Sequence, residues 1–215
     1  MANNIKTVNE ISKGFISSLK MPKRKSKSPV VVAMVGLVGS GRSSIARALA
    51  PLIGATVIES NTIRVALRQK GQDYNPVRNI AEKAVLKTLE VNSNVIMDSD
   101  FIDPKKRESL ERKLKKTGAK IVYLRVSANP EVTIERFIKA KFNPNKDLYK
   151  SSAIAIREMW RRTPHHYNWS EAGGGRFIPK KLKIPFLEVK GASLKRLFFF
   201  IIIFFILSII SLIIS

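Results

Sequence analysis

The stretch VVVAMVGLVGSGRSS, residues 30–44, decides the fold of this chain. Its first six residues are apolar and mostly β-branched, which is typical of a strand that is buried on both faces. Glycines follow at positions 36, 39 and 41, and the sequence IARALAPL (45–52) then has the composition of a helix. The stretch therefore predicts a buried strand, a glycine-rich turn and the start of a helix in direct succession.

The turn matches the phosphate-binding pattern G-x-x-x-x-G-K-[ST] at every position except one, because Arg42 stands where the pattern has lysine. Glycines let backbone N–H groups approach an anion closely, and the helix N-terminus adds a favourable dipole. A hydroxyl at Ser43 is placed to bind Mg²⁺, and the preceding cation neutralises phosphate oxygens. We expect ATP to contact Gly36, Gly39, Ser40, Gly41, Arg42, Ser43 and Ser44; a tight turn without a ligand is the alternative.

Composition bounds the kinds of partner that the chain can have. Its 215 residues carry a formal net charge of +23, which indicates anionic partners such as nucleic acid, lipid headgroups or a phosphorylated substrate. The absence of cysteine excludes disulfides and cysteine-based metal sites. The only histidines, His165 and His166, are adjacent, so we expect them to lie in a loop as solvated residues.

Beyond residue 44 the apolar patterning alternates between strands and helices. This order predicts an α/β fold with a parallel sheet of about five strands between helices. The expected strands are 30–35, 55–60, 94–98, 119–126 and 184–189, and the expected helices after the glycine turn are 61–69 (capped by Ser60 or Asn61), 77–91, 104–116, 130–140 and 150–162.

Both ends of the chain differ from this central part. Apolar residues at helical spacing in 1–20 predict a short amphipathic helix, either packed on the domain or lying on a membrane surface, and a basic linker follows at 21–29. Residues 197–215 contain no charge and no proline, and as a helix they would be about 28 Å long. We therefore expect a basic extension at 1–29, a domain at 30–191 and a membrane anchor at 192–215.

The anchor is expected to be a single C-terminal transmembrane helix. Lys195 and Arg196 stand at its N-terminal side, which places the domain on the cytoplasmic face. A last helix buried against the sheet and a low-complexity tail are the alternatives.

Residues 30–190 resemble the P-loop kinases of the polynucleotide kinase, zeta-toxin and gluconate-kinase-like group, with an AAA-type ATPase domain. The resemblance lies in the glycine turn and in three further motifs, which read SNTIR (60–64), VIMDSDFIDPKKR (95–107) and NPEV (129–132), with Arg136 beyond them. It implies the three-layer fold of the P-loop NTPases, and Mg²⁺-dependent transfer of a phosphoryl group from ATP to a hydroxyl acceptor.

The resemblance also assigns roles to particular residues. Arg64 would hold the acceptor, and Asn61 stands where such kinases have an aspartate as general base; an amide cannot accept that proton. Asp98 would bind Mg²⁺ or take over as base, whereas Asp100 and Asp103 are better explained as turn and helix-cap carboxylates. A mobile lid would bring Arg136 over the phosphates, with Lys139, Lys141, Arg157, Arg161 and Arg162 as further candidates.

Three functions remain open at this stage. The first is an active kinase whose acceptor is a polynucleotide end, a nucleotide or a small metabolite. The second is a nucleotide-binding adaptor that has lost turnover, because Arg42 and Asn61 replace the two residues most closely tied to the chemistry. The third is a basic protein that binds nucleic acid or anionic lipid and in which the glycine turn is vestigial.

Overall fold

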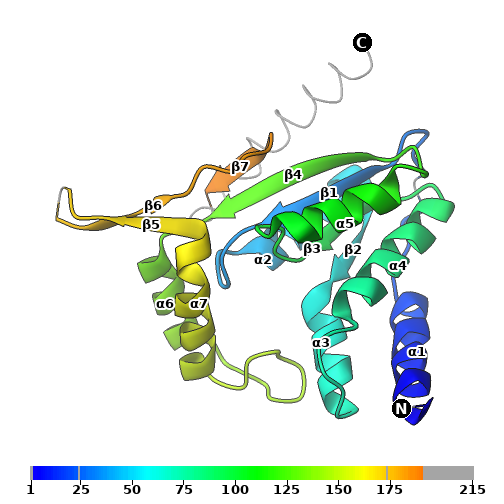
Figure 1. Cartoon of the computed structure of the whole chain (residues 1–215), viewed down its shortest axis with the longest axis horizontal. Coiled ribbons are helices and arrows are strands. Elements are labelled where there is room, and N and C mark those ends of the chain that lie inside the picture. The colour runs from blue at the N-terminus through cyan, green and yellow to red at the C-terminus, as the bar shows by residue number, and fades with distance from the viewer. Residues whose placement is uncertain (1, 24, 173, 191–215) are drawn as a thin grey trace, which may run out of the picture.

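A computed structural model describes residues 2–23, 25–172 and 174–190 of the chain. Helices and strands alternate along most of it (Figure 1). The elements are α1 (Ala2–Ser17), β1 (Val30–Val35), α2 (Arg42–Ile53), β2 (Ala55–Glu59), α3 (Ser60–Gln69), α4 (Val77–Glu90), β3 (Asn94–Asp98), α5 (Pro104–Leu114), β4 (Lys120–Ser127), α6 (Pro130–Lys139), α7 (Ser152–His166), β5 (Tyr167–Ser170), β6 (Arg176–Pro179) and β7 (Leu187–Lys190).

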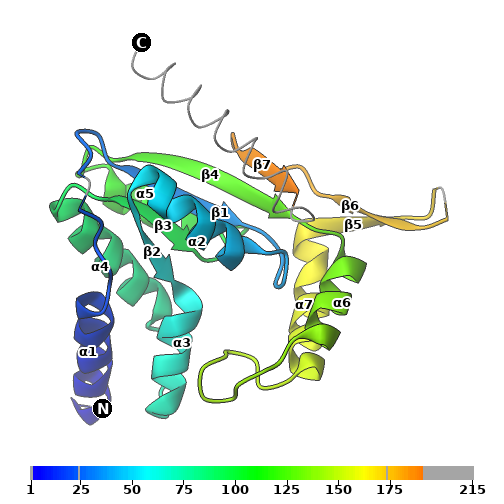
Figure 2. The same cartoon turned by 180° about the vertical axis from the view of Figure 1, so that it is seen from behind.

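Five strands form one parallel sheet in the order β2-β3-β1-β4-β7. The central strand β1 pairs with β3 on one side and β4 on the other, so that Val32 lies between Ile96 and Val122. The predicted parallel, five-stranded α/β sheet is therefore confirmed. Helices α3, α6 and α7 lie at the edge of the sheet where the carboxyl ends of the strands meet (Figures 1 and 2).

Both faces of β1 are buried, which explains why its sequence is continuously apolar. Val31, Ala33 and Val35 belong to the core under α1, α3, α4 and α5. Val32 and Met34 point to the opposite face and pack with apolar residues of α2. A strand with only one buried face would instead alternate between apolar and polar residues.

Helix α1 is packed on the domain, which decides between the two alternatives for residues 1–20. Phe15 is 8% exposed and lies in the core with residues of α3 and α4, while Val8, Ile11 and Ile16 pack against the same cluster. The outward residue Ile5 is 63% exposed.

Some element boundaries differ from the predicted ones. Glu59 precedes the first residue of α3 and caps it without a side-chain hydrogen bond, so the caps predicted at Ser60 and Asn61 are wrong. Strand β2 runs directly into this helix, which leaves both residues inside its first turn. The hairpin of β5 and β6 was not predicted, because four-residue strands with mostly exposed side chains leave little periodic signal.

The predicted membrane helix at 197–215 lies outside the described residues. Among the residues that are described, no helix has both the length and the apolar character needed to cross a bilayer.

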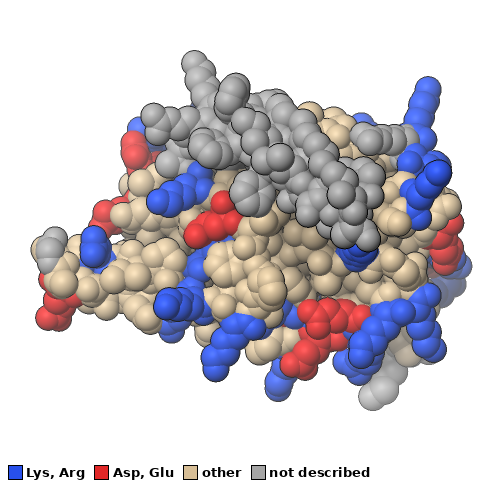
Figure 3. Space-filling view, turned by 90° about the horizontal axis from the view of Figure 1, so that it is seen from above, with Lys and Arg blue, Asp and Glu red and all other residues tan. Residues whose placement is uncertain are grey.

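Basic side chains are spread over the surface of the described residues. On the face seen in Figure 3, lysine and arginine side chains are scattered around the rim, with acidic side chains among them. The charge on that face is therefore dispersed.

The packing of α1 predicts that this helix stabilises the fold mainly by burying the ring of Phe15. Truncation in Phe15→Ala removes a buried aromatic ring and should lower the free energy of unfolding by about 3 kcal/mol. Urea denaturation measures this change. Ile5→Ala on the exposed side of the same helix is the control and should change it by less than about 0.5 kcal/mol; equal losses in both variants would contradict the packing.

Candidate functional site

A cleft of about 1500 Å³ opens at the carboxyl ends of the parallel strands. The glycine turn, the first turns of α3 and α4, the segment after β3, and α6 and α7 with their connecting loop line it. Open α/β sheets place their ligands at this end, because strands and helices diverge there. The volume is large enough for a nucleotide together with a second molecule.

The glycines of the turn are required by its geometry. Gly39 and Gly41 have φ angles of 80° and 101°, which disfavour residues with a side chain. A Cβ on Gly39 would lie 2.4 Å from the Thr133 side chain and 2.6 Å from that of Phe137. A Cβ on Gly36 would lie 2.5 Å from the Val126 carbonyl oxygen. The turn is thus closely packed between β4 and α6, with its backbone facing the cleft.

Ser43 and Asp98 meet at the base of the cleft. The Ser43 hydroxyl donates a hydrogen bond of 2.5 Å to Asp98 Oδ2, and the Asp98 side chain is 5% exposed. One residue comes from the first turn of α2 and the other from the last position of β3, 55 residues later. The fold therefore brings together the two residues that were predicted to bind Mg²⁺.

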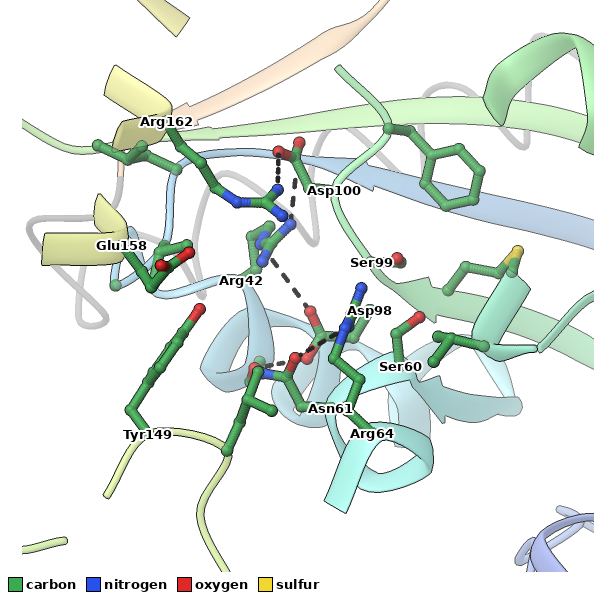
Figure 4. A pocket seen from close by; sticks show the side chains of 18 of the residues that line it. Arg42, Ser60, Asn61, Arg64, Asp98, Ser99, Asp100, Tyr149, Glu158 and Arg162 are labelled. Atoms are coloured by element: carbon green, nitrogen blue, oxygen red, sulfur yellow. Dashed lines mark hydrogen bonds and ion pairs between the residues drawn. The ribbon is translucent and has the colours of Figure 1, made fainter. Parts of the chain in front are cut away.

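Arg42 lies between two carboxylates (Figure 4). Its Nε is 4.0 Å from Asp98 Oδ1, and its Nη1 is 3.9 Å from Asp100 Oδ1. The side chain is only 14% exposed. Arg42 accordingly shares its charge between the two acids at the edge of the phosphate-binding turn.

Asp100 has the predicted turn role, since its Oδ1 accepts a hydrogen bond from Ile102 N at 3.2 Å, but it also occupies a more central position in the cleft. Its side chain is 8% exposed and lies 3.0 Å from His166 Nε2 and 3.7 Å from Arg162 Nη1. Burial alone would raise the pKa of Asp100, but the hydrogen bond with His166 and the charges of Arg42 and Lys106 outweigh it and hold this pKa well below its usual range. Asp103 does cap α5, as predicted.

The two histidines also differ from the prediction of a solvated loop. They form the end of α7, and His166 is buried while His165 is exposed. A single sequence could not reveal the contact between His166 and Asp100, because 66 residues separate them.

Arg64 projects into the cleft from α3 beside Asn61 (Figure 4). Its Nη1 donates to Asn61 Oδ1 at 3.2 Å, and among the described residues no carboxylate pairs with it. Burial lowers the pKa of Arg64, and the nearby charges of Arg162 and Arg42 lower it further. This half of the cleft therefore carries positive charge that no carboxylate of the described residues neutralises by pairing with Arg64.

Arg136 reaches the glycine turn from α6. Its Nη1 lies 3.3 Å from the Gly39 carbonyl oxygen and 3.4 Å from that of Ser40. The other candidate lid cations separate into two groups. Lys141, Arg161 and Arg162 line the cleft, whereas Lys139 pairs with Glu135 on the surface and Arg157 is exposed.

Lys106 is a cleft residue that sequence reasoning missed. Its ammonium group donates to the Ser99 hydroxyl and, at 2.9 Å, to the Asp100 carbonyl oxygen, and it lies 4.5 Å from the centre of the Phe101 ring. Burial lowers the pKa of Lys106 to about 7; Asp100 opposes this shift, while Arg42, Arg64 and Arg162 reinforce it. Its place in a PKKR run resembled an ordinary solvated helix face.

The residues of the cleft fit a bound Mg²⁺-nucleotide. Ser40 Oγ and Arg42 Nη1 are buried and have no hydrogen-bond partner among the described residues. The backbone N–H groups in the first turn of α2 likewise have no carbonyl within the helix to which they can donate. Mg²⁺ in nucleotide sites takes one or two protein oxygens and completes its shell with phosphates and water, which matches the pair Ser43 and Asp98.

A protein-family model described as an AAA domain matches residues 31–163 of the chain. Uncharacterised proteins of Mycobacterium tuberculosis and Mycobacterium bovis are 30% identical over 154 residues, which cover 63% of this chain and 31% of each relative. The chain thus spans about a third of the length of the curated relatives that it matches.

Solved structures also align with this chain at low sequence identity. The protein APE1195 aligns with a TM-score of 0.53 at 18% identity, covering 89% of this chain and all of that one. A gluconokinase of Sinorhizobium meliloti aligns with a TM-score of 0.46 at 16% identity over 79% of this chain and 86% of its own. The Mycobacterium tuberculosis APS kinase, solved with AMPPNP and APS, aligns with a TM-score of 0.49 at 14% identity over 78% of this chain and 91% of its own.

The depressed pKa of Lys106 predicts that stability rises with pH. Between pH 7 and about 10.5 the unfolded chain binds a proton that the folded chain has lost, so the free energy of unfolding should increase by at most about 1.4 kcal/mol per pH unit. Urea denaturation at pH 7, 8 and 9 measures the slope. Lys106→Met should flatten it, whereas Lys105→Met, an exposed neighbour on the same helix, should not. A slope that is identical in all three proteins would contradict the assignment.

Proposed function

Because this chain belongs to the AAA domain family, we propose that it binds ATP with Mg²⁺ in the cleft and transfers the γ-phosphoryl group to the hydroxyl of an acceptor. The acceptor is a polynucleotide end, a nucleotide or a small hydroxyl metabolite. The observation that carries the proposal is the contact between Ser43 and Asp98 directly beside the glycine turn. It joins a phosphate-binding backbone to a pair of oxygen ligands suited to Mg²⁺.

Several cleft residues have a part in this reaction. Backbone N–H groups of the glycine turn and the Arg42 and Arg136 guanidinium groups bind the phosphates and stabilise the charge that moves during transfer. Ser43 and Asp98 would hold Mg²⁺, which would neutralise charge on the phosphate oxygens. Arg64 orients the acceptor from the opposite side, since it points into the cleft without a carboxylate partner among the described residues.

The proton of the acceptor hydroxyl also needs a destination. As the acceptor oxygen bonds to the γ-phosphorus, the bond from that phosphorus to the bridging oxygen of ADP breaks and the hydroxyl proton is released. Asn61 cannot take it, because an amide is not a base near pH 7. The carboxylate of Asp98 would take this role as the alternative to binding Mg²⁺.

Removing the Arg42 charge should weaken nucleotide binding. In Arg42→Ala, the affinity for a fluorescent ATP analogue with Mg²⁺ should fall about 10- to 100-fold, since one charge-assisted contact to phosphate is lost. Arg47→Ala is the matched control, because Arg47 lies on the same helix but is 59% exposed and pairs with Glu59. Equal affinity of the Arg42→Ala and wild-type proteins for the ATP analogue would contradict the proposed nucleotide site.

A nucleotide-binding protein without turnover is the second candidate. The observation in its favour is that Arg42 is already held near Asp98 and Asp100, so a phosphate must compete with two carboxylates for it. Phosphate release from labelled ATP by the wild-type protein separates the two candidates. High release supports the kinase; background release together with a large gain in the double variant Arg42→Lys and Asn61→Asp supports the adaptor.

We also propose that residues 197–215 anchor the protein to the cytoplasmic face of a membrane. This proposal rests on an uncharged apolar stretch that follows Lys195 and Arg196. In cells, the full chain should stay with the membrane fraction after washing with alkaline carbonate. Replacing Ile202 and Ile209 by Lys should release it, and a wild-type chain that washes off would contradict the anchor.

A further inference from the structure

The loop that joins α6 to α7 extends toward α3 (Figures 1 and 2), and its residues Asp147, Leu148 and Tyr149 line the cleft. Arg68, near the end of α3, makes most of the contact. Its Nη1 donates to the Leu148 carbonyl oxygen at 2.8 Å, and its Nη2 donates to those of Pro144 and Asp147 at 2.7 and 3.0 Å. The neighbouring Gln69 donates from Nε2 to the Asn145 carbonyl oxygen at 2.9 Å.

All four acceptors are main-chain carbonyls within residues 144–148, so the contact recognises the shape of the loop rather than its side chains. The loop forms its own turn, in which Asn143 N donates to Asp147 Oδ2 at 2.6 Å and Asp147 N donates to the Asn143 carbonyl oxygen at 2.8 Å. Side chains at 143–146 are exposed, and no residue of this loop belongs to the cores of the described residues. The hydrogen bonds to α3 therefore fix where this turn lies.

The loop carries Tyr149 into the cleft immediately after the last contact with Arg68. The Tyr149 side chain points toward Glu158 and Arg162, across the cleft from Arg64 (Figure 4). Burial raises the pKa of the Tyr149 phenol, so its hydroxyl keeps its proton and can donate a hydrogen bond at neutral pH. Arg64 and Arg68 are one helical turn apart, which gives them the same side of α3.

The two helices that the loop connects each carry cations of the cleft. Helix α6 supplies Arg136 at the glycine turn, and α7 supplies Arg162 beside Asp100. A tether between this loop and α3 thus joins the parts of the cleft that would surround both substrates.

We propose that Arg68 is a positioning residue that latches residues 144–148 to α3 and keeps Tyr149 opposite Arg64. That the latch surrounds two substrates rests on the proposed function, whereas the contact between Arg68 and the loop does not. Arginine suits this task, because its planar guanidinium group donates hydrogen bonds to three carbonyl oxygens at once. A lysine at the same position has a single ammonium group and would hold the loop less well.

A distance measurement tests the latch without any activity. The chain has no cysteine, so Lys70→Cys and Lys146→Cys introduce the only two thiols, one on each side of the contact, for nitroxide labels. Pulsed electron paramagnetic resonance of the labelled protein should give one narrow distance distribution. Adding Arg68→Ala should broaden it toward longer distances, Arg68→Lys should have a smaller effect, and Arg112→Ala on the exposed face of α5 should have none.

An unchanged distribution in Arg68→Ala would overturn the latch. Far-ultraviolet circular dichroism shows whether each variant is folded, and Arg68→Lys preserves the helix and the charge if Arg68→Ala does not fold. A broadened distribution in Arg112→Ala as well would also overturn the specific role of Arg68.

Kinetics with MgATP as the probe adds a second readout. Because the latch positions the loop but does not touch the transferring group, Arg68→Ala should raise KM for ATP about fivefold or more, with a much smaller change in kcat. An equal loss of kcat with an unchanged KM would contradict a positioning role. If the wild-type protein turns over no ATP, the proposed function fails, and the label distances still decide whether the latch exists.

Discussion

The buried carboxylate of Asp100 connects the parts of the cleft. It accepts hydrogen bonds from Gly36 N at 3.4 Å and Ile102 N at 3.2 Å, and it lies 3.0 Å from His166 Nε2. The guanidinium groups of Arg42 and Arg162 lie within 4 Å of it. A charge in so enclosed a place requires such partners, because desolvation would otherwise make it very costly. The glycine turn, the end of β3 and helix α7 are therefore held together at one point.

This arrangement affects how a phosphate could bind. Arg42 stands where phosphate-binding turns have lysine, and its longer, planar group reaches both Asp98 and Asp100. A nucleotide would have to share or displace these contacts, while the backbone N–H groups of the turn offer further donors. With arginine at position 42, a phosphate therefore competes with Asp98 and Asp100 for the guanidinium group. The positively charged side of the cleft near Arg64 remains for a second molecule.

The fold was predictable to a large extent, and the site only in part. The continuous apolar run of β1 and the helical spacing of α4 come from local periodicity, so the parallel sheet and its helices followed from them. Ser43 and Asp98 were predicted together, because a known motif and a strand end have fixed places in such a sheet. Lys106 was missed, since it stands in a run of charged residues that looks the same whether it faces water or a cleft.

The sequence by itself determined the five strands of the parallel sheet and the helices between them, the position of the phosphate-binding turn, and the residues at the ends of the strands. These features depend on local patterns of neighbouring residues and on the parallel arrangement of strands, and that arrangement is common to α/β proteins. Tertiary structure alone decided the roles of Asp100, His166 and Arg68. The contact of His166 with Asp100 joins residues 66 apart along the chain, and that of Arg68 with Leu148 joins residues 80 apart. Contacts over such separations leave no periodic or local signal in a single sequence.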